Sequence, residues 1–312
     1  MQRHYYLGCM LVIIAACCWG LIGLLGAKLN QAGFSGLEVA SLRITLASAV
    51  LIACSPLLWR SLRQFQFKQF PMLAAQSLLG VLLMTVFYFL AVQSIGAALS
   101  VALLYTAPVW SVLLAHFLLK ERMTVSGVIL TLFTVAGVAL CLNTSAPLNV
   151  AGIVFGLLSG FSYACFGVLG KKALNNNPPS ILLYSSVLIS GAVMLFTPFF
   201  HTAMGKLFGD ISANVWGAAL AIAVIGTLLP YALYTRALQW MPATRAQVLT
   251  IFEPLTAVLL AAVILHEPLG WSQYVGIAMI LASALFNALI QPKTPVSVTQ
   301  YNHTQHTQIS GL

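Results

Sequence analysis

Stretches of about 20 apolar residues recur along the whole chain, separated by short polar breaks, and each can cross a bilayer core as one helix. Only 6% of the 312 residues are charged, whereas soluble domains carry about 25%. Most of the surface must therefore face lipid. Within lipid the backbone must satisfy its own hydrogen bonds, and the absence of period-2 alternation favours helices over a barrel. We predict an all-α polytopic membrane protein of about ten spans, at residues 7–27, 37–58, 70–92, 97–118, 125–142, 151–170, 180–200, 213–235, 243–265 and 271–290.

The net charge of +9 reports orientation rather than nucleic-acid binding, because the basic residues are scattered over loops and form no single patch. With a cytoplasmic N-terminus, only Lys28 and Lys206 lie outside, and Arg43 lies within a span. The inside segments hold Arg3, Arg60, Arg63, Lys68, Lys120, Arg122, Lys171, Lys172, Arg236, Arg245 and Lys293. This strong positive-inside bias predicts that both termini are cytoplasmic.

The second half of the chain repeats the first. A shift of 146 residues pairs polar and structural residues that apolar composition does not match by chance: Tyr88 with Tyr234, Gln93 with Gln239, Pro108 with Pro254, and Glu121 with Glu267. A shift of 144 residues pairs the earlier helices: Trp19 with Tyr163, Gly23 with Gly167, Gly26 with Gly170, and Lys28 with Lys172. We interpret this pattern as an internal duplication.

Each copy holds five predicted spans, so the two copies must enter the membrane from opposite sides. Such inverted repeats are typical of secondary transporters, whose substrate site lies near the midplane between the copies. The predicted organisation is a cytoplasmic N-terminus (1–6), a first repeat (7–142), a short extracytoplasmic linker (143–150), a second repeat (151–290) and a disordered cytoplasmic tail (291–312).

Several motifs resemble one transporter family. They are AACCWG, SLRITLASAV and LLYTAPVWSVLLAHFLLKER in the first copy, and FSYACFGVLGKK and IFEPLTAVLLAAVILHEPLGWSQYVGIAMILAS in the second. Over about residues 7–290 the chain resembles EamA-type members of the drug/metabolite transporter (DMT) superfamily. The resemblance implies a ten-helix fold with a central cavity, alternating access, a bacterial inner-membrane location and, often, export of amino acids or related metabolites.

Glu253 is the sharpest candidate for a functional residue. It lies near the centre of the ninth predicted span, where a charged carboxylate is costly unless it faces a cavity or a partner. Its counterpart in the first copy is Ala107, so the acid breaks the symmetry of the repeat. Glu253 could bind a substrate amine or carry a proton, or it could be a protonated structural acid tied to carbonyls freed by Pro254. Thr250, one turn earlier, is a candidate for the same site.

Matched prolines and an arginine are further candidates. Pro108 and Pro254 each remove a backbone donor within a span, which predicts helix breaks that expose carbonyls toward a cavity or kinks that serve packing. Arg43 lies a turn or two inside the second span. Its side chain could snorkel to the interface, which is the default for arginine, or it could hold a substrate carboxylate bidentately.

Aromatic residues are plentiful at membrane depth. Trp19, Tyr163 and Tyr105 are candidates for a cavity wall, where they would offer cation–π faces and hydroxyl donors. For Tyr88 and Tyr234, near the span ends, we expect an interfacial aromatic belt.

Other polar and small residues have structural explanations. Glu121 and Glu267 lie at helix ends and are expected to act in capping or ion pairs rather than in transport. Gly152, Gly156 and Gly160 form a stripe suited to close helix packing, within the protein or across a homodimer. The six cysteines lack a CxxC spacing, and His266-Glu267 lacks a second histidine four residues on, so we predict no metal site and no cofactor.

We expect a secondary transporter that exports a small metabolite, with an amino acid or related amine as the leading substrate class. The partners are then a small-molecule substrate and the lipid bilayer, not nucleic acid. A facilitative importer or a multidrug exporter of organic cations is the alternative. An intramembrane enzyme is disfavoured, because only one acid lies centrally, and a primary pump is disfavoured by the absence of a nucleotide-binding loop.

Overall fold

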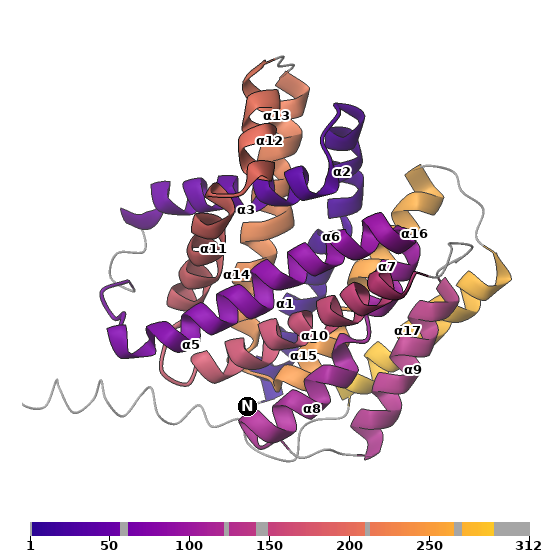
Figure 1. Cartoon of the computed structure of the whole chain (residues 1–312). Coiled ribbons are helices and arrows are strands. Elements are labelled where there is room, and N and C mark those ends of the chain that lie inside the picture. The colour runs from indigo at the N-terminus through magenta and orange to yellow at the C-terminus, as the bar shows by residue number, and fades with distance from the viewer. Residues whose placement is uncertain are drawn as a thin grey trace, which may run out of the picture.

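The computed structural model describes residues 2–56, 62–121, 125–141, 149–209, 213–264 and 270–289. Within these ranges every regular element is a helix, and the helices form one bundle (Figure 1). The helices of the first half are α1 (Gln2–Gly20), α2 (Ile22–Gln31), α3 (Gly36–Ala53), α5 (Phe70–Ala75), α6 (Leu83–Ile95), α7 (Ala97–Leu104), α8 (Ala107–Leu119) and α9 (Val125–Cys141). A 3-10 turn, Phe67–Gln69, precedes α5, and a π-helical segment, Gln76–Leu82, joins α5 to α6.

The second half begins with one long helix and ends with another. Its helices are α10 (Val150–Ala173), α11 (Pro179–Leu195), α12 (Pro198–Gly209), α13 (Ala213–Ala223), α14 (Leu229–Ala237), α15 (Ala243–Leu249), α16 (Phe252–Ile264) and α17 (Trp271–Leu289). A second π-helical segment, Val224–Leu228, joins α13 to α14.

Six helical stretches among the described residues are long and apolar enough to cross a membrane, and a seventh qualifies if the bent pair α11–α12 is one span. The remaining predicted spans correspond to α9, to α15 with α16, and to α17. The predicted fold class, a polytopic all-α membrane protein built from two five-helix repeats, is confirmed.

The element boundaries repeat with the same spacing as the sequence. Corresponding helices start 146 residues apart: α6 with α14 at Leu83 and Leu229, α7 with α15 at Ala97 and Ala243, and α9 with α17 at Val125 and Trp271. Both π-helical segments end at matched positions, Leu82 and Leu228. The duplication is therefore a property of the helix breaks as well as of the residues.

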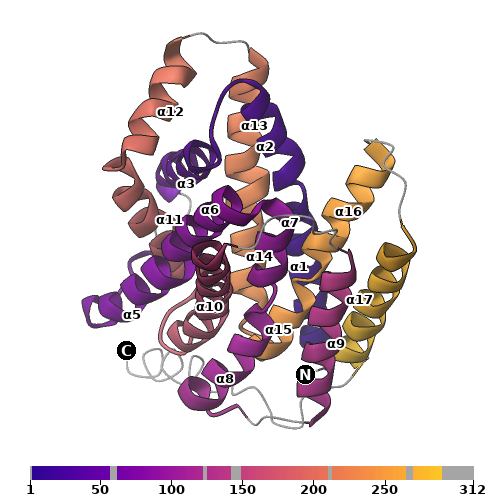
Figure 2. The same cartoon turned by 45° about the vertical axis from the view of Figure 1, so that its right-hand side comes forward.

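The two halves exchange their first helices. The helix that opens the second half, α10, packs against α6, α7 and α8 of the first half. Conversely, α1 packs against α14, α15 and α16 of the second half. The last helices of the two halves, α9 and α17, lie side by side at the edge of the bundle (Figures 1 and 2). This interleaving brings both repeats to one central region.

One prediction about the spans is wrong. The predicted span 180–200 and the loop after it instead form α11 and α12, which meet at an angle of 85°. Pro198 starts α12, because proline cannot continue α11 but suits a first helical turn. Lys206 on α12 forms an ion pair of 2.8 Å with Glu38, which also forms a capping box with Ser35 at the start of α3. These contacts hold α12 against α3.

Candidate substrate-binding cavity

A cavity of about 370 Å³ lies between the two halves. Its walls come from α1, α2, α3, α6 and α7 of the first half and from α10, α14 and α16 of the second. The volume lies within the range of about 300–1,000 Å³ typical of small-molecule sites. The lining extends to Asn30, Gly36 and Ala97. These residues lie at the end of α2 and at the starts of α3 and α7, next to loops that are predicted to be outside.

Glu253 lines this cavity from the first turn of α16. The hydroxyl of Tyr163 on α10 donates a hydrogen bond of 3.3 Å to its carboxylate. Tyr105 is 1% exposed and lines the same wall, as predicted, and its hydroxyl lies beside the carboxylate of Glu253. Two tyrosine hydroxyls therefore lie next to the acid of this wall.

Arg43 also lines the cavity, from the middle of α3. It is 8% exposed, so the snorkelling interpretation is wrong. Its Nη2 donates to the hydroxyl oxygen of Thr85 at 3.3 Å, while its Nε has no partner among the described residues. The hydroxyl of Thr85 in turn donates to the carbonyl of Val81. Among the described side chains, Arg43 and Glu253 form no ion pair with each other, so the groups keep donor and acceptor capacity for a ligand.

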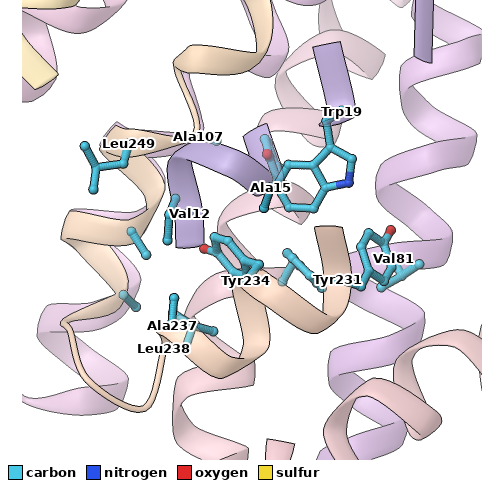
Figure 3. Close-up of a cluster of buried hydrophobic side chains, with 14 of the residues drawn as sticks. Val12, Ala15, Trp19, Val81, Ala107, Tyr231, Tyr234, Ala237, Leu238 and Leu249 are labelled. Carbon is cyan, nitrogen blue, oxygen red and sulfur yellow. The ribbon is translucent and has the colours of Figure 1, made fainter. Parts of the chain in front are cut away.

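An aromatic cluster closes one end of the cavity. The indole of Trp19 lies 6.2 Å from the ring of Tyr163, 5.9 Å from Tyr231 and 5.7 Å from Tyr234. Figure 3 shows Trp19 facing the two tyrosines of α14. Tyr88 lines the cavity and Tyr234 is fully buried beneath it. The interfacial belt expected for these last two residues is therefore wrong, because both side chains face the interior of the bundle.

Both proline-containing spans are broken at matched depth, as predicted. The first breaks at Tyr105 and Thr106, between α7 and α8. The second breaks at Thr250 and Ile251, between α15 and α16. Pro108 and Pro254 each lie in the first turn after the break, where a missing N–H removes no helical hydrogen bond.

The carbonyls at the first break do not point into the cavity. A Cβ at Gly160 on α10 would lie 2.7 Å from the carbonyl oxygen of Leu103 and 3.1 Å from that of Leu104. The break therefore lies against α10. Thr250 is fully buried, donates its hydroxyl to the carbonyl of Gln247, and does not line the cavity.

The glycine stripe of α10 packs within the chain. A Cβ at Gly152 would lie 2.5 Å from Ile95, and one at Gly156 would lie 2.5 Å from Leu103. Together with Gly160, these glycines let α10 approach α6 and α7 closely, and a homodimer that uses this face stays a prediction.

Glu121, at the end of α8, makes contacts more specific than the capping or ion pairing that the sequence predicts. Its Oε1 accepts from the backbone N–H of Ala243 at 3.2 Å, and its Oε2 accepts from the hydroxyl of Thr244 at 2.9 Å. It thus caps α15 of the opposite repeat rather than its own helix. Its counterpart Glu267 lies outside the described residues.

Met84, Thr85 and Phe166 are among the lining residues that the sequence does not identify. Thr85 lies one turn before Tyr88 on the same face of α6, a spacing that could have identified it once Tyr88 was placed in the cavity. No group of three or more His, Cys, Asp or Glu residues that could hold a metal ion occurs in the described ranges. Cys9, Cys17, Cys18, Cys54 and Cys165 are free thiols.

Known proteins share this architecture. A solved structure, described only as the crystal structure of a protein, superposes with a TM-score of 0.72 over 90% of this chain and 97% of that chain, at 18% identity. An uncharacterized transporter of Archaeoglobus fulgidus is 33% identical over 198 residues, which cover 64% of this chain and 69% of the relative. The threonine/homoserine exporter RhtA of Salmonella typhimurium is 27% identical over 261 residues, which cover 82% of this chain and 83% of the relative.

The model of the EamA-like transporter family matches the chain twice, at residues 6–143 and 150–289. The two matches correspond to the two halves whose helices start 146 residues apart. The chain is therefore a member of the EamA-like transporter family, within the drug/metabolite transporter superfamily.

Proposed function

We propose that this protein is a secondary transporter that exports a small zwitterion, an amino acid or a closely related amine, by alternating access around the central cavity. The observation that carries the proposal is the presence of one basic and one acidic side chain, Arg43 and Glu253, in the wall of a single cavity. No ion pair among the described residues joins them.

Each pole of a zwitterion then has a partner. The guanidinium of Arg43 binds the carboxylate, because a planar donor pair matches carboxylate geometry. The carboxylate of Glu253 binds the ammonium group, or exchanges it for a proton when the cavity changes sides. The rings of Trp19 and Tyr163 pack against the substrate side chain, and the hydroxyl of Tyr105, beside Glu253, supplies a further hydrogen bond.

Family membership supports transport, and the name of one relative, the threonine/homoserine exporter RhtA, supports amino-acid export. We place the chain in a bacterial inner membrane on the basis of its family resemblance. The basic residues of its loops place both termini in the cytoplasm. The transporting units are then residues 7–142 and 151–290, the linker 143–150 is extracytoplasmic, and the N-terminus (1–6) and tail (291–312) are cytoplasmic.

This orientation also assigns a state to the structure. The cavity reaches Asn30, Gly36 and Ala97, which would lie toward the outside, so the transporter faces outward. The orientation is tested with a single cysteine introduced near either terminus. A membrane-impermeant thiol reagent is applied to intact cells and to lysed cells. Modification of a terminus in intact cells would contradict it.

Export from cells tests the function itself. Cells that over-produce the protein are compared with cells that produce Glu253→Gln or Arg43→Gln, and extracellular amino acids are measured over time. We expect one amino acid to accumulate outside, and each variant to reduce its export about tenfold or more, since a hydrogen bond to a charged group contributes about 1.5–3 kcal/mol. Lys28→Gln is the matched control, because it removes a positive charge from an exposed position.

The pattern of loss separates the alternatives. An organic-cation exporter would lose activity in Glu253→Gln and keep it in Arg43→Gln. A facilitative importer would deplete the compound from the medium. If no solute moves in cells or in reconstituted vesicles containing folded protein, the transport proposal is wrong.

A further inference from the structure

The repeat relates the wall of the observed cavity to a second set of residues in the other half of the chain. In five pairs one residue lines the cavity and its counterpart does not: Gly23 with Gly167, Gly26 with Gly170, Tyr88 with Tyr234, Ala97 with Ala243, and Val101 with Gln247. Other pairs, such as Trp19 with Tyr163, line it on both sides. The counterparts are all buried. In an inverted repeat, one half adopts in the second state the arrangement that the other half has in the first. These buried residues therefore mark where the cavity lies when the transporter faces the other way.

Two of these counterparts carry polar groups without partners. Gln247 is fully buried, and neither its Nε2 nor its Oε1 has a hydrogen-bond partner among the described residues. Tyr234 is fully buried as well, and its hydroxyl lacks a partner in the same described ranges. Buried polar atoms are nearly always paired in folded proteins. These three atoms thus indicate a site whose partner is absent from this conformation.

The side chains of Tyr234 and Gln247 both extend toward Gly167 on α10. A Cβ at Gly167 on α10 would lie 2.7 Å from the hydroxyl of Tyr234 and 3.2 Å from Oε1 of Gln247. The absence of a side chain at Gly167 leaves room for both polar groups to approach α10. Gly23, the counterpart of Gly167, has no atom within 4 Å of the equivalent position, because it faces the open cavity.

The end of the bundle next to this site is closed by a contact between the repeats. Glu121 on α8 accepts hydrogen bonds from Ala243 and Thr244, the first two residues of α15. Lys171 at the end of α10 donates to the carbonyl of Leu238, just before α15. The equivalent start of α7, Ala97, instead lines the cavity. We name the contact of Glu121 with Ala243 and Thr244 the Glu121 clamp.

We propose that Tyr234 and Gln247 form a second binding site for the transported zwitterion, which opens when the Glu121 clamp releases α15. Tyr234 is joined to the observed cavity through Trp19, whose ring lies 5.7 Å from its own. The inference rests on the proposed transport function. The amide N–H of Gln247 donates to the substrate carboxylate, and its carbonyl accepts from the ammonium group. The hydroxyl of Tyr234 binds either pole. This site is neutral, whereas the observed cavity carries Arg43 and Glu253, so the substrate is bound by different chemistry in the two states.

The accessibility of one residue pair tests the proposal. Val101→Cys and Gln247→Cys are made separately in the full chain with its native cysteines replaced by alanine, in a background that retains export. A membrane-impermeant thiol reagent is applied to vesicles from each side in turn. We expect the Val101→Cys variant to react with reagent on the extracytoplasmic side. The Gln247→Cys variant should react only with reagent on the cytoplasmic side.

The clamp is tested in the same vesicles. Glu121→Ala should raise the rate of labelling of the Gln247→Cys variant about tenfold or more and lower that of the Val101→Cys variant, because a charged acceptor with two bonds is lost. Thr244→Val, which removes one of the two bonds, should have a smaller effect in the same direction. Binding is tested with Gln247→Leu in the protein that retains its native cysteines. This variant should raise the KM for substrate on the side of Gln247 about fivefold.

The outcomes separate this inference from the proposed function. If the cysteine-free parent protein exports normally and its Val101→Cys variant is labelled, but the Gln247→Cys variant is never labelled from the opposite side, the second site does not exist. An unchanged KM in Gln247→Leu would likewise overturn its binding role. If the folded protein moves no solute and neither variant changes its labelling when substrate is added, the transport proposal itself fails.

Discussion

Two glycines one turn apart in the cavity wall provide a matched test of the packing around Glu253. A Cβ at Gly20, the last residue of α1, would lie 2.6 Å from Cβ of Thr256 and 2.7 Å from the carbonyl oxygen of Glu253. A Cβ at Gly23, in the first turn of α2, would have no neighbour within 4 Å. Both glycines line the cavity. Gly20→Ala and Gly23→Ala therefore add the same methyl group, once against α16 and once into open space.

The expected difference in stability follows from these distances. Ordinary contacts begin near 3.4 Å, so the methyl group at Gly20 requires α1 or α16 to move by several tenths of an ångström. Overpacking of this kind costs roughly 1–3 kcal/mol. Alanine in place of helical glycine contributes about 0.5–1 kcal/mol of stability to both variants, and this gain cancels in the comparison. Gly20→Ala should thus be about 1–3 kcal/mol less stable than Gly23→Ala.

The same shift should affect transport, because the displaced carbonyl belongs to Glu253. We expect Gly20→Ala to reduce the initial rate of export about tenfold, since positioning errors below 1 Å can have effects of that order. Gly23→Ala only narrows the cavity and should change the rate by less than about threefold. The measurements are thermal unfolding of the purified proteins in detergent and initial export rates per amount of inserted protein. If Gly20→Ala unfolds at the same temperature as Gly23→Ala or higher, the close approach of α1 to α16 is incorrect.

Three further substitutions have expected outcomes. Tyr163→Phe removes the hydroxyl that donates to Glu253 at 3.3 Å and should raise the KM for export about two- to fivefold with little effect on thermal unfolding; an unchanged KM would contradict the contact. Glu38→Gln removes the ion pair with Lys206, whose side chain is 39% exposed, and should lower the free energy of unfolding by less than about 1 kcal/mol, with a smaller effect at high salt. Gly80→Ala would place a Cβ 2.6 Å from Cα of Phe166 and should destabilise the protein by roughly 1–3 kcal/mol, whereas Gly205→Ala, with no neighbour within 4 Å, should be neutral or stabilising.

The positions of the spans could be predicted because the length of an apolar stretch is set by the thickness of the bilayer. The predicted starts at 97, 125, 213, 243 and 271 coincide with the starts of α7, α9, α13, α15 and α17. The helix α12 was missed, because its segment is short and mixes polar with apolar residues. Its position depends on the ion pair of Lys206 with Glu38, a contact between residues 168 apart in the chain, and local sequence does not reveal it.

The cavity could be predicted only in part. Tyr105 was placed correctly because it lies one turn before Pro108, where a helix break was expected. The positions of Tyr88 and Tyr234 were misjudged, since hydropathy does not reveal which face of a helix turns toward the interior or that these helices continue to Ile95 and Ala237. Arg43 could not be assigned between lipid and cavity, because that choice depends on how α3 is rotated against α6, where Thr85 accepts its hydrogen bond.

The two repeats share the breaks between α7 and α8 and between α15 and α16, but they differ in several polar residues around the cavity, and this difference has a mechanistic consequence. Glu253 corresponds to Ala107 and Gln247 to Val101, while α11, the counterpart of α3, holds no charged residue to match Arg43. We expect the matched breaks to give similar packing around the cavity in either state, so that this part of the scaffold creates little preference for one state. The charges bias the equilibrium, because the charged cavity and the neutral site around Gln247 bind a substrate with different affinity. A ligand shifts a two-state equilibrium only by that difference in affinity. A variant that removes these differences, Val101→Gln combined with Glu253→Ala and Arg43→Leu, should therefore bind substrate with similar affinity from both sides. A retained difference in affinity between the sides would show that the scaffold itself is asymmetric.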